Sequence, residues 1–243
     1  MKDPSKIKVL VACEESQRVC MAFRERGFDA YSCDVQEPSG GHPEWHILGD
    51  ALKAIGAEKI TTMDGTTHYI GKWDLLIAHP PCTYLSNVAT RHYSLRCTPA
   101  EKVCARLQER TKAAVFFMRF ALAEIPHIAV ENPVGIMNTV YHKPDQIIHP
   151  WQFSGGEQDK ECYVTKATCL WLKGLPPLMH TYTGDAPDNA KIYGVSPSTG
   201  KAYNWETAVS RNRQRERSKT FPGIAKAMAK QWGDYLLRED EEK

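Results

Sequence analysis

The chain has 243 residues, with 31 Lys and Arg against 29 Asp and Glu, a length that suits one large domain or one domain with a modest insertion. Apolar residues make up 42% and charged residues 25%, which are ordinary globular values and exclude a disordered tail. The net charge of only +2 excludes a uniformly basic nucleic-acid-binding surface but leaves room for a local basic patch.

Eight cysteines are scattered along the chain without any CxxC pair, the spacing with which zinc ribbons bring two thiolates onto one ion. The sequence therefore predicts no structural metal. The first apolar run stops at Glu14 and is too short for a secretory signal, and the longest, 113–123, contains Arg119 and is too short to span a membrane. We expect a cytoplasmic protein with reduced thiols and no membrane partner.

Apolar runs typical of buried strands alternate with helical patterns through the first half of the chain. The expected strands are 7–12, 28–33, 73–78 and 127–130, and the expected helices are 15–26 and about 98–124, the latter with Thr98 as N-cap and Pro99 at the first helical position. This order predicts a doubly wound α/β fold with a mostly parallel sheet, whose ligands bind at the carboxyl ends of the strands. Asp34, Cys82 and Glu131 each follow such an end directly.

The second half of the chain has a different composition. Residues from about 134 to 206 are rich in Pro, Gly, Trp, Tyr and His, and only 161–172 resembles a strand or hairpin. A basic run, 210–219, is either a solvated face or a phosphate-binding strip, and a final helix over about 222–237 has an apolar face. We predict a catalytic and cofactor-binding core over 1–133, a loop-rich substrate-recognition region over 134–206, and a basic segment with a C-terminal helix returning to the core over 207–243.

The segment HPPCTYLS, His79–Ser86, is the most informative stretch. Two prolines fix the backbone after a strand and remove two amide donors, so they can present the next side chain, Cys82, rigidly in a cleft. A cysteine in that place is a candidate nucleophile, provided that its thiolate is stabilised. The alternative is a proline turn with a buried structural cysteine. For His79 we expect a turn histidine bonded to the backbone rather than a ligand or an active-site acid.

Glu131-Asn132-Pro133 follows the next expected strand. Consecutive strands of a parallel sheet are usually neighbours, so Cys82 and Glu131 are expected to converge. A carboxylate beside a thiol suits attack on an unsaturated ring, where a proton must reach the ring nitrogen as the nucleophile adds. The alternative is that Glu131 caps a turn or pairs with a surface cation.

Together these two motifs resemble those of the DNA cytosine C5-methyltransferases, whose corresponding motifs are Pro-Cys-Gln-x-x-Ser and Glu-Asn-Val. The resemblance extends to the segments 7–27, Cys33-Asp34-Val35, Gly49-Asp50-Ala51 and about 220–233. It covers more than half of the chain and does not include 134–206. It implies the fold of the S-adenosylmethionine-dependent methyltransferases and a small member of bacterial or phage type.

The resemblance also implies roles. Cys82 would attack C6 of a cytosine flipped out of duplex DNA, Glu131 would contact N3 and the exocyclic amine, and C5 would take methyl from S-adenosylmethionine. Asp34 would bind the ribose hydroxyls of this cofactor and Asp50 its adenine amino group, with further cofactor contacts from Ala12, Cys13, Glu14, Ser16, Val35, Ala51 and Pro80. The expected substrate-binding residues are Ser86, Asn132, Lys166, Arg211 and Arg213.

Three departures from the family pattern keep alternatives open. First, the glycine-rich first loop is replaced by ACEESQ over 12–17. Second, Thr83 stands where the family has Gln, and Pro133 where it has Val. Third, the family's Gln-x-Arg-x-Arg element, which supports the target base, has no clear counterpart, and Lys166 is the candidate substitute. A relative that transfers another group, an enzyme acting on free cytosine nucleotides, and an inactive DNA- or protein-binding descendant of the fold all remain open. A methyltransferase acting on adenine N6 or cytosine N4 is disfavoured, because an aromatic residue would then follow the prolines in place of Cys82.

Overall fold

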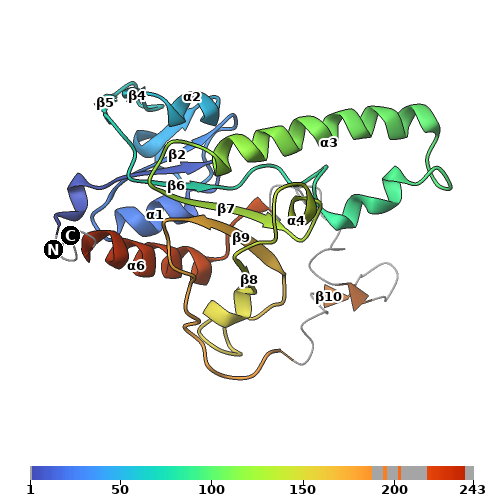
Figure 1. Ribbon diagram of the computed structural model, residues 1–243. Coiled ribbons are helices and arrows are strands. Elements are labelled where there is room, and N and C mark those ends of the chain that lie inside the picture. Colours follow the sequence, from blue (N-terminus) through green and yellow to red (C-terminus); the bar gives the residue numbers. More distant parts are fainter. Residues whose placement is uncertain (1, 188–193, 196–201, 204–217, 239–243) are drawn as a thin grey trace.

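A computed structural model describes residues 2–187, 194–195, 202–203 and 218–238, and its centre is a seven-stranded sheet with helices on both faces (Figure 1). Its strands are β1 (Lys8–Ala12), β2 (Asp29–Asp34), β3 (His46–Leu48), β6 (Leu75–Ala78), β7 (His127–Pro133), β8 (Gln146–Ile148) and β9 (Thr168–Lys173). The strand order is β3-β2-β1-β6-β7-β9-β8. The first five strands are parallel, whereas β9 runs antiparallel to both β7 and β8.

The strand order reverses at β1. From β1 the chain first builds outward through β2 to β3 and then returns to the other side of β1 to add β6 and β7. The reversal lies between β1 and β6, and open α/β sheets bind their ligands at the carboxyl ends of the strands at such a point. The sheet is doubly wound and mostly parallel, as predicted.

The apolar run of β1 is explained by burial on both faces. Val9 and Val11 point into the core shared with α1 (Arg18–Arg24) and α6 (Pro222–Arg238), while Leu10 and Ala12 point into the core shared with α2 (Ala51–Ile55) and α3 (Ala100–Ala121). Figure 1 shows the two helix layers on opposite sides of the sheet. The C-terminal helix therefore covers the central strands, as the sequence predicts.

Several short elements escaped sequence analysis because they are too brief to show a period. They are β3, α2, β8, an antiparallel hairpin of β4 (Lys59–Thr61) and β5 (Thr67–Tyr69), a pair of β10 (Gly194–Val195) and β11 (Ala202–Tyr203), the 3₁₀ helices η1 (Pro4–Lys6), η2 (Pro43–Trp45), η3 (Asn87–Tyr93) and η4 (Pro150–Phe153), and α4 (Met137–Val140). Among the residues described, no helix is long and apolar enough to cross a membrane.

Three boundaries differ from the prediction. Helix α1 begins at Arg18 because the preceding residues form a loop in which Cys13 and Gln17 have positive φ angles of 59° and 57°. Helix α3 begins after Pro99, which is its N-cap, so Thr98 does not cap it. Strand β7 continues beyond Val130 because its last three residues pair with β9, and Glu131 therefore lies on the strand rather than past its end.

The expected strand or hairpin over 161–172 is wrong in its first half, since regular structure begins only at Thr168. The region 134–206 nevertheless contributes β8 and β9 to the main sheet. Within this region, β9 pairs with β7 along a stretch that includes Glu131 and Asn132. The division into three segments stays a prediction, and part of the middle segment supports the strand on which the candidate acid stands.

Candidate active site

The carboxyl ends of β1 and β6 are followed by the loop 13–17 and by the turn that contains Cys82. The two strand ends are joined where the backbone N–H of His79 donates to the carbonyl of Ala12 at 2.9 Å. In the turn, the carbonyl of Cys82 accepts hydrogen bonds from the N–H groups of Leu85 and Ser86, each at 3.0 Å. The Cys82 residue itself is exposed, which contradicts the alternative of a buried structural cysteine. All eight cysteines of the chain are free thiols.

The segments that follow β6 and β7 are bound to each other through their backbones. The N–H of Ile136 donates to Leu85 O at 2.9 Å, and the N–H of Asn87 donates to Val134 O at 3.1 Å. Gly135 lies between these bonds, and a Cβ atom there would stand only 2.1 Å from Leu85 O. Only glycine permits this approach, which holds the Cys82 turn against the end of β7.

A side chain from β7 makes a second connection to the turn. The buried side-chain amide of Asn132 donates to Pro80 O at 2.7 Å and so fixes the backbone of the turn at this proline. Its Oδ1 atom is buried and accepts no hydrogen bond from the described residues. The structure thus gives Asn132, predicted to bind substrate, a visible role in positioning the Cys82 turn.

Glu131 and His79 form a buried pair. Nδ1 of His79 donates to Oε2 of Glu131 at 2.9 Å, with the two side chains only 6% and 16% exposed. Burial opposes the charge on His79, but the hydrogen bond and negative charge of Glu131, with the charge of Glu14, outweigh it and raise the pKa of the imidazole. Burial likewise opposes the charge on Glu131, yet the contact with His79 and the charge of Lys166 leave the pKa of this carboxyl below its ordinary value. Both shifts favour the charged form of each partner.

The prediction that the His79 side chain bonds only to backbone is wrong. The parallel register pairs Ala78 with Val130, which places the next residues of the two strands, His79 and Glu131, side by side. If β6 and β7 are assumed to be neighbouring parallel strands, this register predicts the contact between His79 and Glu131 from the sequence. The Nε2 atom of His79 is buried and has no hydrogen-bond partner in the described chain. Buried polar atoms are almost always paired, so this orphan atom marks a place for a ligand group or water.

Glu14 lies in the first loop, where the family that the sequence resembles has glycines. Its buried carboxylate accepts from the N–H groups of Val19 and Cys20, at 2.6 and 3.2 Å, and so satisfies donors at the start of α1. Burial raises the pKa of Glu14 to about 7, against the lowering effects of His79 and of these two amides. The helix end that could receive an anionic ligand group is thus filled by the protein's own carboxylate.

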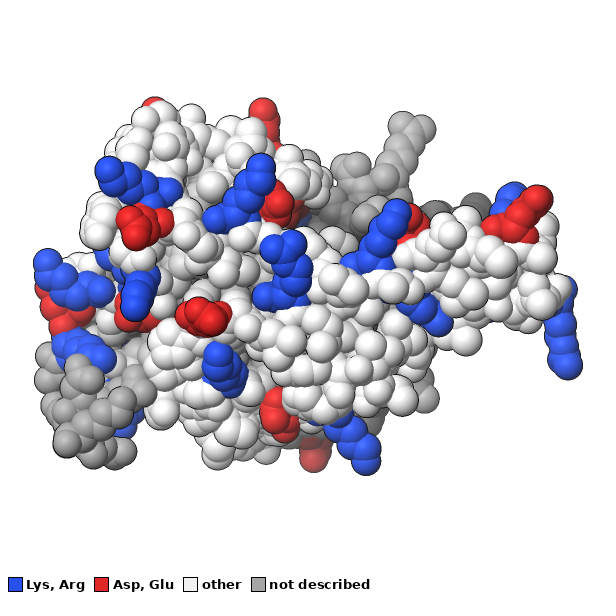
Figure 2. Space-filling view, turned by 45° about the horizontal axis from the view of Figure 1, so that its top comes forward, with Lys and Arg blue, Asp and Glu red and all other residues white. Residues whose placement is uncertain are grey.

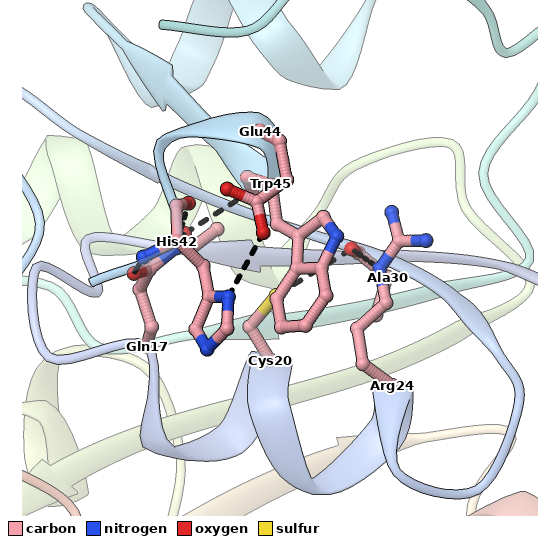
Figure 3. A network of polar contacts seen from close by, with 8 residues as sticks. Gln17, Cys20, Arg24, Ala30, His42, Glu44 and Trp45 are labelled. Atoms are coloured by element: carbon pink, nitrogen blue, oxygen red, sulfur yellow. Dashed lines mark hydrogen bonds and ion pairs between the residues drawn. The ribbon is translucent and has the colours of Figure 1, made fainter. Parts of the chain in front are cut away.

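The same loop is braced from the side, as Figure 3 shows. The Gln17 amide donates to His42 O at 2.9 Å and accepts from His42 N at 3.1 Å. The imidazole of His42 in turn stacks on Trp45, with ring centroids 3.9 Å apart. This network explains how a loop without glycine keeps two left-handed residues in place.

Two carboxylates and two exposed apolar side chains stand at the ends of β2 and β3. Asp34 accepts from Gln36 N, and Asp50 caps α2 by accepting from Leu52 N, both at 2.9 Å, which leaves the other oxygen of each without a partner in the described part of the chain. Beside them Val35 and Leu48 are 76% and 48% exposed. The carboxylates could accept from paired ribose hydroxyls or from an amine, and the exposed apolar side chains could contact a flat ring. These groups fit the nucleoside half of S-adenosylmethionine. Ala12, Ala51, Ser16 and Pro80 are buried, and Cys13 is partly buried, near Asp34 and Asp50.

The remaining predicted substrate-binding residues fall in different places. Lys166 is half-buried, with its ammonium group 5.5 Å from the ring centroid of Phe221 and close enough to Glu131 to affect its pKa. A small pocket is lined by Glu131, Lys166, Thr168, Thr220, Phe221 and Ile224. Ser86 accepts from Val88 N at 3.3 Å and caps η3. Arg211 and Arg213 lie outside the described residues.

Comparisons with known proteins add little beyond this geometry. No protein-family profile matches the chain, and no curated protein matches it. One solved structure, a proposed DNA modification methyltransferase encoded within a prophage of E. coli, aligns with 79% of this chain at 13% identity and a TM-score of 0.43. The chain spans only 56% of that protein's length. A likeness of this degree carries no argument about function. Within the described residues, no group of three or more His, Cys, Asp or Glu could hold a metal ion.

The backbone contact at Gly135 leads to a first prediction. Gly135→Ala forces the two segments apart and is expected to destabilise the protein by roughly 1–3 kcal/mol, because the obstructing atom is backbone and cannot rotate away. Urea unfolding measures the effect. Gly155→Ala is the matched control, since a Cβ there meets nothing nearer than 3.8 Å. A Gly135→Ala protein as stable as the control would show that the two segments are not held together in this way.

The burial of Glu14 leads to a second prediction. Its pKa in the folded state, about 7, lies above the ordinary 4.5, so its contribution to stability is fully present below pH 4.5 and is lost as pH rises through 7. Glu14→Gln is expected to match the wild type at pH 5 and to be more stable by about 2–3 kcal/mol at pH 8. Chemical unfolding at both pH values measures this, with the exposed Glu25→Gln as control. Equal loss of stability toward pH 8 in wild type and Glu14→Gln would contradict the assignment.

Proposed function

We propose that the protein transfers a methyl group from S-adenosylmethionine to C5 of cytosine in DNA, through a covalent bond between Cys82 Sγ and C6 of the base. One observation carries the proposal: the turn that bears the exposed Cys82 begins at His79, which forms a buried pair with Glu131, at the strand ends where open α/β sheets bind their ligands. A nucleophile and a proton donor on neighbouring strands are what addition to a pyrimidine ring requires.

The addition needs one proton at the ring nitrogen. As the Cys82 thiolate forms its bond to C6, the C5–C6 double bond opens and negative charge is delivered toward N3. Glu131, directed at N3 and the exocyclic amine, supplies a proton there. Because the carboxylate of Glu131 is already ionised, it must first receive that proton, and the imidazole of His79, hydrogen-bonded to it, can donate the proton.

His79 therefore deepens the proposed mechanism. The pair holds one proton, carried by His79 in the resting state because the pKa of the imidazole is raised and that of Glu131 is lowered. When the base accepts a proton from Glu131, the His79 proton moves onto the carboxylate, and the imidazole becomes neutral. C5 of the adduct then takes the methyl group, whose departure turns the sulfonium into a neutral thioether. The C5 hydrogen leaves as a proton to water, the Cys82–C6 bond breaks to restore the ring and free the thiolate, and N3 returns its proton to the pair.

S-adenosylmethionine, when bound, supplies an electrophilic methyl group. We place its nucleoside half against Asp34, Val35 and Asp50, where two carboxylates and exposed apolar surface meet. Glu14 already accepts from the amides at the start of α1, so we assign the amino-acid half to other groups. The orphan Nε2 of His79 can donate to its carboxylate, and the orphan Oδ1 of Asn132 can accept from its ammonium group. This arrangement differs from a glycine-rich loop, which leaves the helix amides open.

The covalent step is tested by trapping. Duplex DNA of mixed sequence, with 5-fluorocytosine in place of cytosine, is expected to form a denaturant-resistant adduct with the protein when S-adenosylmethionine is present, because fluorine at C5 cannot leave as a proton would. Cys82→Ser should form no adduct and should lose at least about 100-fold in transfer of tritiated methyl to ordinary duplex, since a serine hydroxyl is barely ionised. Cys97→Ser, which changes another exposed cysteine, is the control and should keep both properties. Methyl transfer by Cys82→Ser at the normal rate would exclude the mechanism, and labelling of dCMP alone would exclude a DNA substrate.

The part assigned to His79 is tested by the pH dependence of kcat. In the wild type, kcat should decline as pH rises through the raised pKa of the imidazole, because the proton of the pair is then lost. His79→Gln keeps a donor to Glu131 but has no transferable proton, so kcat should fall by about 100-fold and lose this alkaline decline, while KM for DNA changes little. A variant that keeps the wild-type alkaline decline would show that His79 only holds Glu131 in position.

A further inference from the structure

A long projection extends from the Cys82 turn away from the sheet (Figure 1). We call residues 87–112 the arm: it comprises η3, the connection 94–99 and the first half of α3. With 22 residues and a rise of 1.5 Å per residue, α3 is about 33 Å long. Its buried residues are concentrated after Ala114, and Val103 is the one buried residue of α3 within the arm. The arm therefore adds little to the core, and its length needs another explanation.

The arm is held in a defined shape by two arginines of α3. The guanidinium of Arg110 lies 3.3 Å from the ring centroid of Tyr93, and its Nε donates to Tyr84 O at 3.1 Å. Arg106 lies over both Tyr84 and Tyr93, at 5.1 and 5.2 Å from their centroids. Cation–π contacts of this kind join η3 to α3 and fix both to the residue two positions after Cys82. The arm is thus braced directly on the candidate catalytic turn.

The charge of the arm is unlike that of the rest of the protein. It holds six Lys and Arg against two Glu, a net charge of +4, whereas the whole chain carries +2. Arg91, Arg96 and Lys102 are exposed, and no carboxylate of the described residues pairs with them, although Lys112 pairs with Glu109 at 2.7 Å. In Figure 2, Lys and Arg side chains in blue lie at the outer end of the projecting part. Three uncompensated cations therefore stand on a surface that has no role in the core.

We propose that the arm binds the phosphates of the duplex DNA that carries the target base, with Arg91, Arg96 and Lys102 as the phosphate-binding side chains. This inference rests on the proposed function for its choice of partner. DNA offers a line of charges about 1.7 Å apart along its axis, and phosphate contacts set the position of a protein on the duplex without reading sequence. The η3 helix begins five residues after Cys82, so a duplex held by the arm has its bases beside the thiol. This surface is separate from the basic run 210–219 and from Lys166.

Fluorescence anisotropy with a mixed-sequence duplex, over a series of salt concentrations, tests the assignment without any catalytic step. The arm variant is Arg91→Ala, Arg96→Ala and Lys102→Ala combined. The matched control combines Lys59→Ala, Lys72→Ala and Lys226→Ala, which removes the same charge from exposed positions on β4–β5, the turn before β6, and α6. All six side chains are exposed, so both proteins should fold, and thermal unfolding checks that they do.

Each phosphate contact contributes about 0.9 to the slope of log K against log salt, so the arm variant should lose about 3 from the slope magnitude. Its affinity at 0.1 M salt should fall by on the order of 100-fold, and the control should bind as the wild type does. If the wild type binds duplex and the arm variant binds equally well with the same slope, the arm is not the DNA-binding surface, while the proposed function stands. If the wild type binds no duplex even at low salt, both fail. Equal losses in the two variants would show a general charge effect and overturn the assignment.

Discussion

The ion pair between His79 and Glu131 is the interaction on which the arrangement of the site depends. Two ionisable groups are buried at the ends of neighbouring strands, and either one alone would be a desolvated charge, a cost of several kcal/mol. The pair therefore requires the β6–β7 register that brings the residues side by side. The same requirement explains why the backbone after β6 is bound so closely to that after β7, through Gly135 and through the Asn132 amide on Pro80. Cys82 stands on the turn that these contacts immobilise.

The loop that departs from the methyltransferase pattern is electrostatically linked to His79. A glycine-rich loop leaves the amides of the following helix open, whereas Glu14 fills them here. A buried carboxylate at that place needs a positive charge within reach, and His79 supplies one, since each group shifts the pKa of the other toward its charged form. The acid in the first loop and the histidine before the prolines therefore interact electrostatically.

The sequence predicts the central sheet well because β1, β6 and β7 are buried on both faces and show it as continuous apolar runs. It also indicates Cys82 and Glu131, because each follows such a run within a short motif. It does not reveal the partner of His79, since that contact depends on the register between two strands separated by 48 residues of helix and loop. It indicates a strand near β9 but gives no sign that β8 and β9 join the same sheet, because local periodicity does not show which strands pair. The pairing of β9 with Glu131 and Asn132 is what extends β7 by three residues.

The near-neutral charge of the chain is a poor guide to what it binds, for a reason of scale. Electrostatic potential at physiological salt decays over about 8 Å, so a phosphate responds to the side chains within that distance and not to the sum over the protein. The arm reaches well beyond that distance from the core, and Arg91, Arg96 and Lys102 have no carboxylate partner among the described residues, so its +4 acts almost independently of the −2 that remains for the rest of the chain. For the proposed DNA substrate, a balanced body would limit attraction in the wrong orientation, while the arm would attract the duplex close to the Cys82 turn. A local excess of positive charge on a nearly neutral protein would thus favour the productive orientation of the duplex more than its overall affinity.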